Sequence, residues 1–373
     1  MELINRKFES KELCSCTSLG IGGYTENYIE VNDILELVNV VSHAIDNSVE
    51  LIVLGEGSNV LISDNGFDGI VVKNRILGIE AAFEDEKSII LQVGAGENWD
   101  NFVQHTVSLG LWGAENLSLI PGTVGATPIQ NVGAFGQEVK NIIHSIRAFD
   151  TKTQSERVFA PEECEFGFRS SIFNGRESRR YIITYVSFKL SKEFAPILSR
   201  SEVKNGIIGL DIDNITPSLI RNIVIKHRTS GLALPNSESL GSAGTFFRTA
   251  IVDSQAVYKI FFKTLFNLGP KVALMILAFG WKYRSKEGFR LPSKILIDAC
   301  NLKGLRVGSS FLYGTNSAVV TTSLLENPSS SDIINILQIV RKTVYYKTGV
   351  KIPIEPTLLG FSDKEIYDIF DIG

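Results

Sequence analysis

The sequence predicts an α+β protein with more than one domain. The chain has 373 residues, which is too long for one ordinary domain and suits two or three. Short β-branched runs, separated by Gly, Asn and Asp, dominate as far as about residue 228. From about residue 229 the sequence begins with a stretch rich in Gly and Ser, followed by two helical runs and further strands. This mixture of strands and helices favours the α+β class.

The N-terminal region combines one helix with several short strands. Apolar residues at helical spacing predict a helix in "NDILELVNVVSHAIDNS" (32–48), which leads into a strand at 50–54. The run "VELIVLGEGSNVLISDNGFDGIVVKN" then predicts strand, loop, strand, turn and strand. Its Gly-x-Gly lacks the third glycine of a dinucleotide fingerprint, because Val60 stands there, and the run after it is strand-like. We therefore exclude a dinucleotide-binding βαβ unit.

The later regions give clearer helices. One is predicted around "NWDNFVQHTVSLG" (98–110), and two more are predicted in "VDSQAVYKIFFKTLF" (252–266) and "SSSDIINILQIVRKTVYYKTG" (329–349). A strand is predicted at "SAVVTT" (317–322). The longest apolar run, "VALMILAFGW" (272–281), is too short to span a bilayer and is interpreted as a buried helix.

Composition limits the kinds of partner. Hydrophobic residues make up 44% of the chain, charged residues 21%, and the formal net charge is −4. No global positive field would attract nucleic acid or an acidic membrane, so we expect a small-molecule partner and no membrane partner. Charges are mixed through the first fifteen residues, which argues against a signal peptide and predicts a cytoplasmic protein. We expect no metal site and free thiols at all four cysteines: Cys14, Cys16, Cys164 and Cys300.

Three segments rich in glycine point to a bound cofactor. They are "GEGSN" (55–59), "GAGENW" (94–99) and "PGTVGA" (121–126). Where side chains are absent a ligand can approach the main chain, and successive N–H groups can solvate a pyrophosphate without any lysine. The third segment lies inside "ENLSLIPGTVGATPIQNVGAFG" (115–136), which carries a single charge. Together these segments predict a cofactor that bears phosphate.

The chain resembles a known family of flavoenzymes in these same segments. "LGEGSNVLISDNGFDGIVV", "VGAGENWDNFV", "GAENLSLIPGTVGATPIQNVGAFGQEV" and "EFGFRSSIFN" occur in the order and spacing of the UDP-N-acetylenolpyruvoylglucosamine reductases of peptidoglycan synthesis, which build the cell wall. The match is nearly continuous from about residue 50 to 175 and becomes patchy after 190. The segment 176–240 resembles the longer form of the family, which carries an extra substrate-covering loop.

The resemblance implies a fold, its cofactors and a division of the chain. The fold would be the vanillyl-alcohol-oxidase-like FAD-binding fold in two parts, 1–72 (completed by about 350–373) and 73–228, followed by an α+β substrate domain at 229–349. The cofactors would be FAD and NADPH, and we expect a monomer. The residues expected around FAD are Gly55, Glu56, Gly57, Ser58, Asn59, Gly122, Thr123, Gly125, Ala126, Gln130, Asn131 and Gly133.

The family reaction reduces an enolpyruvyl ether to a lactyl ether, and three positions match its catalytic residues. In that family NADPH reduces the flavin, a hydride then reaches C3 of the enolpyruvyl group, and a proton is added at C2. Arg169 in "FGFRSS" matches the arginine that meets the substrate carboxylate, and Glu355 in "IPIEPTLLG" matches the glutamate that assists it. Thr245 in "GSAGTFFRTA" stands where the family has its proton donor, so it is either the donor or a structural hydroxyl.

The half of the chain that would hold the substrate departs from the family pattern. Arg200 replaces a tyrosine of the covering loop, Gly231 replaces a lysine that meets the nucleotide phosphates, and Tyr313 stands near a family histidine. Arg248 and Thr249 also differ from the motif that follows the donor, and with Arg200 they are predicted to contact substrate. The expected substrate is UDP-N-acetylglucosamine enolpyruvate, reduced to UDP-N-acetylmuramate. The alternatives are a paralogue that reduces another enolpyruvyl compound and a flavin-binding protein without catalysis.

Overall fold

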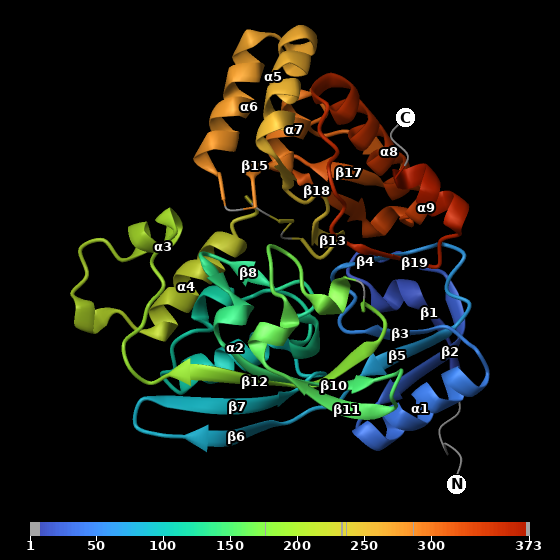
Figure 1. Ribbon diagram of the computed structural model, residues 1–373, viewed down its shortest axis with the longest axis vertical. Helices are drawn as coiled ribbons and strands as arrows, with labels where there is room; N and C mark the ends of the chain where they lie inside the picture. The colour runs from blue at the N-terminus through green and yellow to red at the C-terminus, as the bar shows by residue number, and fades with distance from the viewer. Residues whose placement is uncertain (1–7, 176, 233, 236, 286, 371–373) are drawn as a thin grey trace. The chain divides into compact units, whose positions relative to one another are not determined.

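The chain forms two compact units, each built from several segments. The computed structural model describes residues 8–175, 177–232, 234–235, 237–285 and 287–370 (Figure 1). The first unit comprises Met1–Lys11, Thr25–Glu56 and Asp68–Thr229, and the second comprises Glu12–Tyr24, Gly57–Phe67 and Ser230–Gly373. The three-part division inferred from the sequence stays a prediction, and its ends at residues 1–7 and 371–373 lie outside the described residues.

A small, largely parallel sheet opens the first unit. Its strand order is β1 (Glu9–Glu12), β2 (Tyr24–Val31), β5 (Ile70–Asn74) and β3 (Leu51–Leu54), and β5 pairs in parallel with both β2 and β3. Helix α1 (Ile34–Asp46) begins at Asp33, whose side chain accepts a hydrogen bond from the N–H of Glu36. The buried face of α1, which includes Leu37 and Val41, shares one hydrophobic core with the strands.

A five-stranded antiparallel sheet forms the rest of the first unit's framework. Its order is β11 (Ser155–Phe159), β10 (Ile143–Asp150), β12 (Tyr181–Ser191), β7 (Ser88–Gly94) and β6 (Ile79–Glu84). Helix α2 (Trp99–Ser108) packs on it through a cluster of rings, with Phe102 and Phe188 only 4.9 Å apart between centroids. The remaining elements are the hairpin β8 (Gly133–Ala134) and β9 (Gln137–Glu138), and the helices α3 (Ser201–Gly206) and α4 (Pro217–Arg228).

The second unit surrounds a four-stranded sheet with helices. The strand order is β13 (Leu240–Thr245), β18 (Asn316–Ser323), β17 (Ser310–Tyr313) and β16 (Arg306–Val307). The long helix α8 (Ser330–Thr348) shares a core with this sheet, in which Ile336, Leu337 and Val320 are fully buried. Two short pairings complete the strands: β14 (Ala250–Val252) with β15 (Phe289–Leu291), and β4 (Val60–Ile62) with β19 (Thr357–Leu359). The other helices are α5 (Ser254–Leu268), α6 (Pro270–Lys282), α7 (Ser293–Ala299) and α9 (Asp363–Phe370).

Most elements expected from the sequence are confirmed. The predicted helices at 32–48, 98–110, 252–266 and 329–349 are α1, α2, α5 and α8, and the strand at 317–322 is β18. Strand β4 follows the first glycine loop, as the missing third glycine predicts. No helix in the described part of the chain is both long and apolar enough to cross a bilayer.

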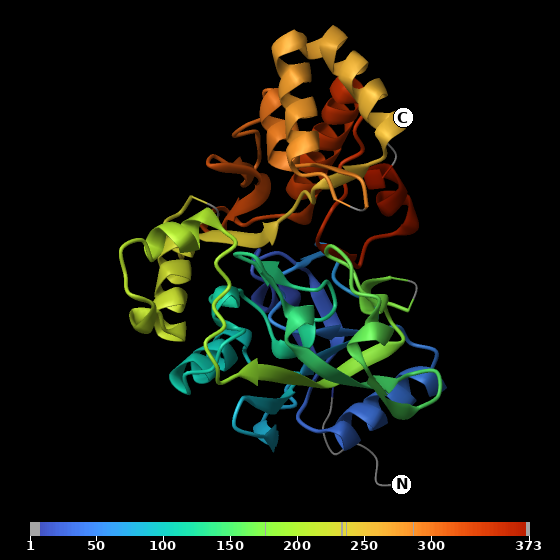
Figure 2. The same cartoon turned by 60° about the vertical axis from the view of Figure 1, so that its left-hand side comes forward.

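The interpretation of 272–281 as a buried helix is wrong in one respect. The segment is helical, as α6, but Leu274 and Trp281 remain 58% and 55% exposed. The reason is that α6 forms a hairpin with α5, visible in both views, so that only the face carrying Ala273, Ile276 and Gly280 is covered (Figure 2). Hydrophobicity predicted the helix but not which of its faces would be buried.

Candidate active site

The second and third glycine loops meet inside the first unit, together with Gly55 at the start of the first loop. The N–H of Gly125 donates to the carbonyl of Ala95 at 2.9 Å, and the N–H of Val124 donates to the carbonyl of Glu97 at 2.8 Å. These bonds join the second loop to the third. Gly55 of the first loop lies against Thr123, since a Cβ at Gly55 would stand 2.7 Å from the Thr123 hydroxyl oxygen. Gly55 and the second and third loops therefore lie together, and their contact with FAD stays a prediction.

The close approach of these loops requires glycine at position 125. A Cβ there would stand 2.6 Å from the Cβ of Ala95, closer than two carbon atoms can approach without a shift of the backbone. Gly122 is required for a different reason, because its φ of 128° is a conformation that other residues rarely adopt. The third loop is thus shaped by two glycines that are needed on separate physical grounds.

Backbone donors at this place fit a phosphate-bearing ligand. Within the described part of the chain, the N–H groups of Glu56, Gly122 and Thr123 donate to no protein acceptor, although Gly122 and Thr123 are buried. Buried N–H groups without acceptors are costly, so a bound anion at this place would satisfy them. The half-buried amide of Gln130 also has no partner among the described residues. These donors fit the pyrophosphate and polar edges of FAD.

Asn131, expected to contact FAD, is held by protein groups. Its side-chain nitrogen donates to a carboxylate oxygen of Glu138 and to the carbonyl of Gly167, each at 3.0 Å, and its side-chain oxygen accepts from the N–H of Lys140. The side chain is only 1% exposed and is satisfied by protein groups alone. Asn131 therefore fastens the turn at Gly167 to the cofactor loop, and direct contact with the cofactor stays a prediction.

That turn carries Arg169. An isolated antiparallel bridge joins Gly167 to Ser170, and Arg169 inside it has a φ of 54°, a left-handed conformation that costs roughly 1 kcal/mol in a non-glycine residue. The Arg169 guanidinium donates to the carbonyl of Gly133 at 2.9 Å. The structure thus places the predicted catalytic Arg169 beside Gly133, in the segment that is expected to line the flavin. The backbone of Arg169 is strained in this position.

A second arginine near this place was not predicted. Arg228, at the end of α4, donates through Nε to the carbonyl of Leu119 at 3.0 Å. Burial lowers the pKa of the Arg228 guanidinium, and the charge of Arg169 lowers it further against the opposing charge of Asp100. Arg228 is therefore a second cation in the first unit whose charge is affected by Arg169. A cation at a helix C-terminus is usually interpreted as a dipole cap, so no separate signal for Arg228 is visible in the sequence.

An ion pair holds α4 in position behind Arg228. Arg221 donates to both carboxylate oxygens of Asp100, at 2.6 and 2.8 Å, and both side chains are largely buried. Asp100 also accepts the N–H of Leu119, a residue with a φ of 56°. Although burial raises the pKa of Asp100, these donors hold it below its ordinary value. The pair therefore links α2, α4 and the start of the segment 115–136, which is called the cofactor segment below because it contains the third glycine loop.

Arg200, predicted to contact substrate, is the residue immediately before helix α3. It is exposed. Its side chain and Ser199 stand where a Cβ at Gly136 would be, with Arg200 Cγ 3.6 Å from that position. The covering loop therefore reaches the end of the cofactor segment, and the contact of Arg200 with substrate stays a prediction.

The other two catalytic candidates, Thr245 and Glu355, lie on adjacent segments of the second unit. The N–H of Glu355 donates to the carbonyl of Phe246 at 3.0 Å, and Phe247 forms an isolated antiparallel bridge with Ile354. Thr245 is the residue before Phe246, and it is exposed at the end of β13. The C-terminal tail thus runs beside the strand that ends in Thr245, which places a carboxyl group and a hydroxyl group on adjacent segments.

The second unit also holds Arg248, Thr249 and part of the first glycine loop. The backbone of Arg248 is fixed by Pro353 and by Ser293, and Thr249 is half-buried beside it. Ala126 belongs to the third glycine loop of the first unit, while Gly57, Ser58 and Asn59 lie in the second. Asn59 accepts the N–H of Thr357 through its carbonyl at 3.1 Å, so the first glycine loop is continuous with the tail that carries Glu355.

Two positions that depart from the family pattern contact each other. The hydroxyl of Tyr313 donates to the carbonyl of Gly231 at 2.7 Å, and the hydroxyl of Thr315 donates to the same carbonyl at 3.2 Å. Gly231 has a φ of 71°. Gly231 and Tyr313, both expected to differ from the family pattern, are therefore joined by a hydrogen bond.

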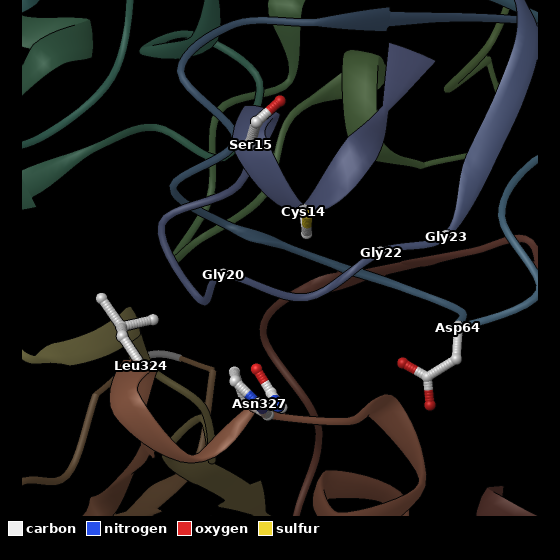
Figure 3. A pocket seen from close by; sticks show the side chains of 9 residues that line it. Cys14, Ser15, Gly20, Gly22, Gly23, Asp64, Leu324 and Asn327 are labelled. Atoms are coloured by element: carbon white, nitrogen blue, oxygen red, sulfur yellow. The ribbon is translucent and has the colours of Figure 1, made fainter. Parts of the chain in front are cut away.

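A cavity of about 410 Å³ in the second unit lies beside Cys14, one of the predicted free thiols (Figure 3). Cys14 and Asp64 line it, and all four cysteines are free. The Asp64 carboxylate is already engaged, because both oxygens accept the N–H of Ser330 at 2.8 and 3.0 Å. Asp64 therefore stabilises the start of α8, and the cavity offers no carboxylate that is ready for catalysis.

A buried glutamate next to the cofactor segment was also missed. Glu115 is fully buried, its Oε2 accepts the N–H of Gly113 at 2.6 Å, and its Oε1 has no partner among the described residues. Burial raises the pKa of Glu115 to about 7, against the opposing backbone donors. A carboxyl group with a pKa of about 7 is close to half protonated near neutral pH.

Comparison with known proteins agrees with this geometry. The family model for the FAD binding domain matches residues 25–157, and the model for the C-terminal domain of UDP-N-acetylenolpyruvoylglucosamine reductase matches residues 235–359. The UDP-N-acetylenolpyruvoylglucosamine reductase of Neisseria meningitidis serogroup B is 32% identical over 93% of this chain and 96% of its own length. The enzyme of the same name from Escherichia coli K12 is 32% identical over 92% and 94%. A crystal structure of that reductase from Thermus caldophilus, 22% identical, aligns with a TM-score of 0.61 over 95% of this chain and 99% of its own.

The fold and the cofactor loops define an FAD-dependent oxidoreductase with a vanillyl-alcohol-oxidase-like FAD-binding domain and a separate C-terminal domain. Identity above 30% over nearly the whole length of the relatives makes the assignment more specific. The chain belongs to the UDP-N-acetylenolpyruvoylglucosamine reductase family.

Proposed function

We propose that this chain uses NADPH to reduce the enolpyruvyl ether of UDP-N-acetylglucosamine enolpyruvate, giving UDP-N-acetylmuramate for peptidoglycan synthesis. It is proposed to work as a cytoplasmic monomer. The observation that carries the chemistry is the pairing of the Glu355 segment with the strand that ends in Thr245. A carboxyl and a hydroxyl on adjacent segments suit a reaction that develops charge at a carboxylate and needs a proton beside it.

Each residue then has a defined task. Bound FAD would carry the hydride between NADPH and the substrate. Arg169 and Arg228 bind anionic groups of the substrate, and Arg169, held by Gly133, stabilises the carboxylate as negative charge builds up. Glu355 assists at the same carboxylate, and the Thr245 hydroxyl donates the proton at C2. Asn131 positions the Arg169 turn rather than reacting.

Purified protein tests this proposal directly. A flavin absorbance spectrum and rapid NADPH oxidation that depends on UDP-N-acetylglucosamine enolpyruvate are the expected results. Flavin reduction by NADPH without turnover of that substrate would instead support a paralogue with another enolpyruvyl substrate, to which the changes at Arg200, Gly231 and Arg248 would be matched. Absence of any reaction with NADPH would support a non-catalytic flavin-binding protein.

A further inference from the structure

The α5–α6 hairpin exposes several large apolar side chains to solvent. Tyr258, Phe262 and Phe266 recur every four residues along α5 and are between 55% and 85% exposed. Side chains four apart lie on one face of a helix, so these three rings form a single stripe. On α6, Leu274 and Trp281 form a second exposed pair. Large exposed apolar patches of this kind mark sites of interaction.

The same hairpin is strongly basic. Residues 254–284 contain no aspartate or glutamate, although the whole chain has a net charge of −4. They contain five cations, Lys259, Lys263, Lys271, Lys282 and Arg284. Lys271 and Lys282 are exposed and lie three and eight residues from Leu274, on its side of α6. Cations and apolar side chains therefore share one exposed face.

The shape of the hairpin argues against a peptide or a helix as the partner. The seam between α5 and α6, lined by residues such as Ile260, Ala273 and Gly280, contains a cavity of only about 10 Å³. The described residues of this seam leave no groove to receive a segment of another protein, and the rings of Tyr258, Phe262 and Phe266 are exposed instead of lining a pocket. A second copy of this chain is also disfavoured, because the exposed Lys271 and Lys282 of one copy would repel those of the other.

We propose that the α5–α6 hairpin docks on the surface of an anionic phospholipid bilayer. A basic amphipathic surface with protruding Phe, Leu and Trp side chains inserts its apolar groups at the boundary of head groups and acyl chains. Lysine side chains at its edge reach the lipid phosphates, and each contributes to the attraction. The hairpin lies on the membrane without crossing it. This departs from the prediction of no membrane partner, which rested on the net charge of the whole chain.

Vesicle sedimentation with the full chain tests the proposal. The protein is expected to sediment with vesicles of phosphatidylglycerol and phosphatidylcholine, to be released by high salt, and to stay in solution with phosphatidylcholine alone. The double substitution Phe262→Ser and Phe266→Ser should weaken binding roughly tenfold or more. The independent double substitution Lys271→Glu and Lys282→Glu should weaken it by a similar factor.

Matched controls separate the hairpin from general effects. Leu325→Ser removes a side chain that is 82% exposed elsewhere in the second unit, and Lys342→Glu reverses an exposed charge on α8. Both should leave vesicle binding unchanged, and all variants should retain their flavin absorbance. Failure of the parent protein to bind anionic vesicles at low salt would overturn the proposal, as would equal losses in the controls. A dimer in size-exclusion chromatography that the phenylalanine substitutions dissociate would also overturn it, because the hairpin would then contact a second copy.

Discussion

The backbone N–H of Glu355 donates to the carbonyl of Phe246, 3.0 Å away, and so fixes the C-terminal tail beside Thr245. The two residues are 109 positions apart in the sequence, and the contact depends on backbone atoms alone. Substituting the side chain of Thr245 or of Glu355 should therefore change the chemistry of the site without releasing the tail. This makes Thr245 and Glu355 suitable for kinetic tests.

Thr245→Val tests the proton donor. Valine keeps the branched shape and removes only the hydroxyl, so turnover of the enolpyruvyl substrate should fall by about a hundredfold or more if Thr245 donates the proton. Reduction of the flavin by NADPH should be unchanged, and Thr245→Ser should retain activity because the hydroxyl remains. The measurement is stopped-flow absorbance of each half-reaction. Equal activity of the valine and serine variants would assign Thr245 a structural role.

Arg169→Lys tests the carboxylate contact. Lysine keeps the charge but loses the planar two-pronged donor, so transfer to the substrate should slow by about a hundredfold while flavin reduction by NADPH stays close to the parent rate. Arg157→Lys is a suitable control, because Arg157 forms a half-exposed ion pair with Glu163. Equal slowing of both half-reactions would contradict the role of Arg169 at the substrate.

The cofactor loops could be predicted because their chemistry is local. Gly122 has a positive φ, and Gly125 lies too close to Ala95 to carry a side chain. Both requirements act on the local backbone, so the glycines in the sequence indicate them. Arg228 and Glu115 escaped prediction because burial, which changes their pKa values, depends on the packing of segments far apart in the sequence. The exposure of Trp281 on α6 escaped for the same reason, since an apolar helix does not reveal which face its neighbours will cover.

Arg221→Met tests the ion pair behind the cofactor segment. The change leaves Asp100 with a largely buried charge and without its two-pronged partner, so the free energy of unfolding should fall by about 2 to 3 kcal/mol. FAD should also be retained less well, because Asp100 holds Leu119. Urea denaturation measures the first effect and equilibrium dialysis the second. Arg179→Met, which breaks an exposed ion pair with Glu50, should cost less than about 1 kcal/mol.

Glu115→Gln tests the buried carboxyl group. Because the pKa of Glu115 is raised to about 7 in the folded protein from an ordinary value of 4.5, its contribution to stability is fully present below pH 4.5 and is lost as the pH rises through 7. The loss should reach about 3 kcal/mol in the parent protein at alkaline pH. Glutamine can still accept the N–H of Gly113 and cannot ionise, so this part of the pH dependence should disappear. Urea midpoints at several pH values measure it, and identical profiles for the two proteins would refute the assignment.

Gly125→Ala tests whether close approach of the loops is needed to bind the cofactor. The added methyl would stand 2.6 Å from the Cβ of Ala95, so the second and third loops must separate. Overpacking of this kind costs roughly 1 to 3 kcal/mol, and the shift would also move the N–H donors of Gly122 and Thr123. We expect weaker retention of FAD, measured from the flavin absorbance after gel filtration, together with a lower melting temperature. Gly314→Ala adds the same methyl where nothing lies within 4 Å and should change neither quantity. If Gly125→Ala lowered the melting temperature but retained FAD fully, the loops would serve the fold and the donors for the cofactor would have to lie elsewhere.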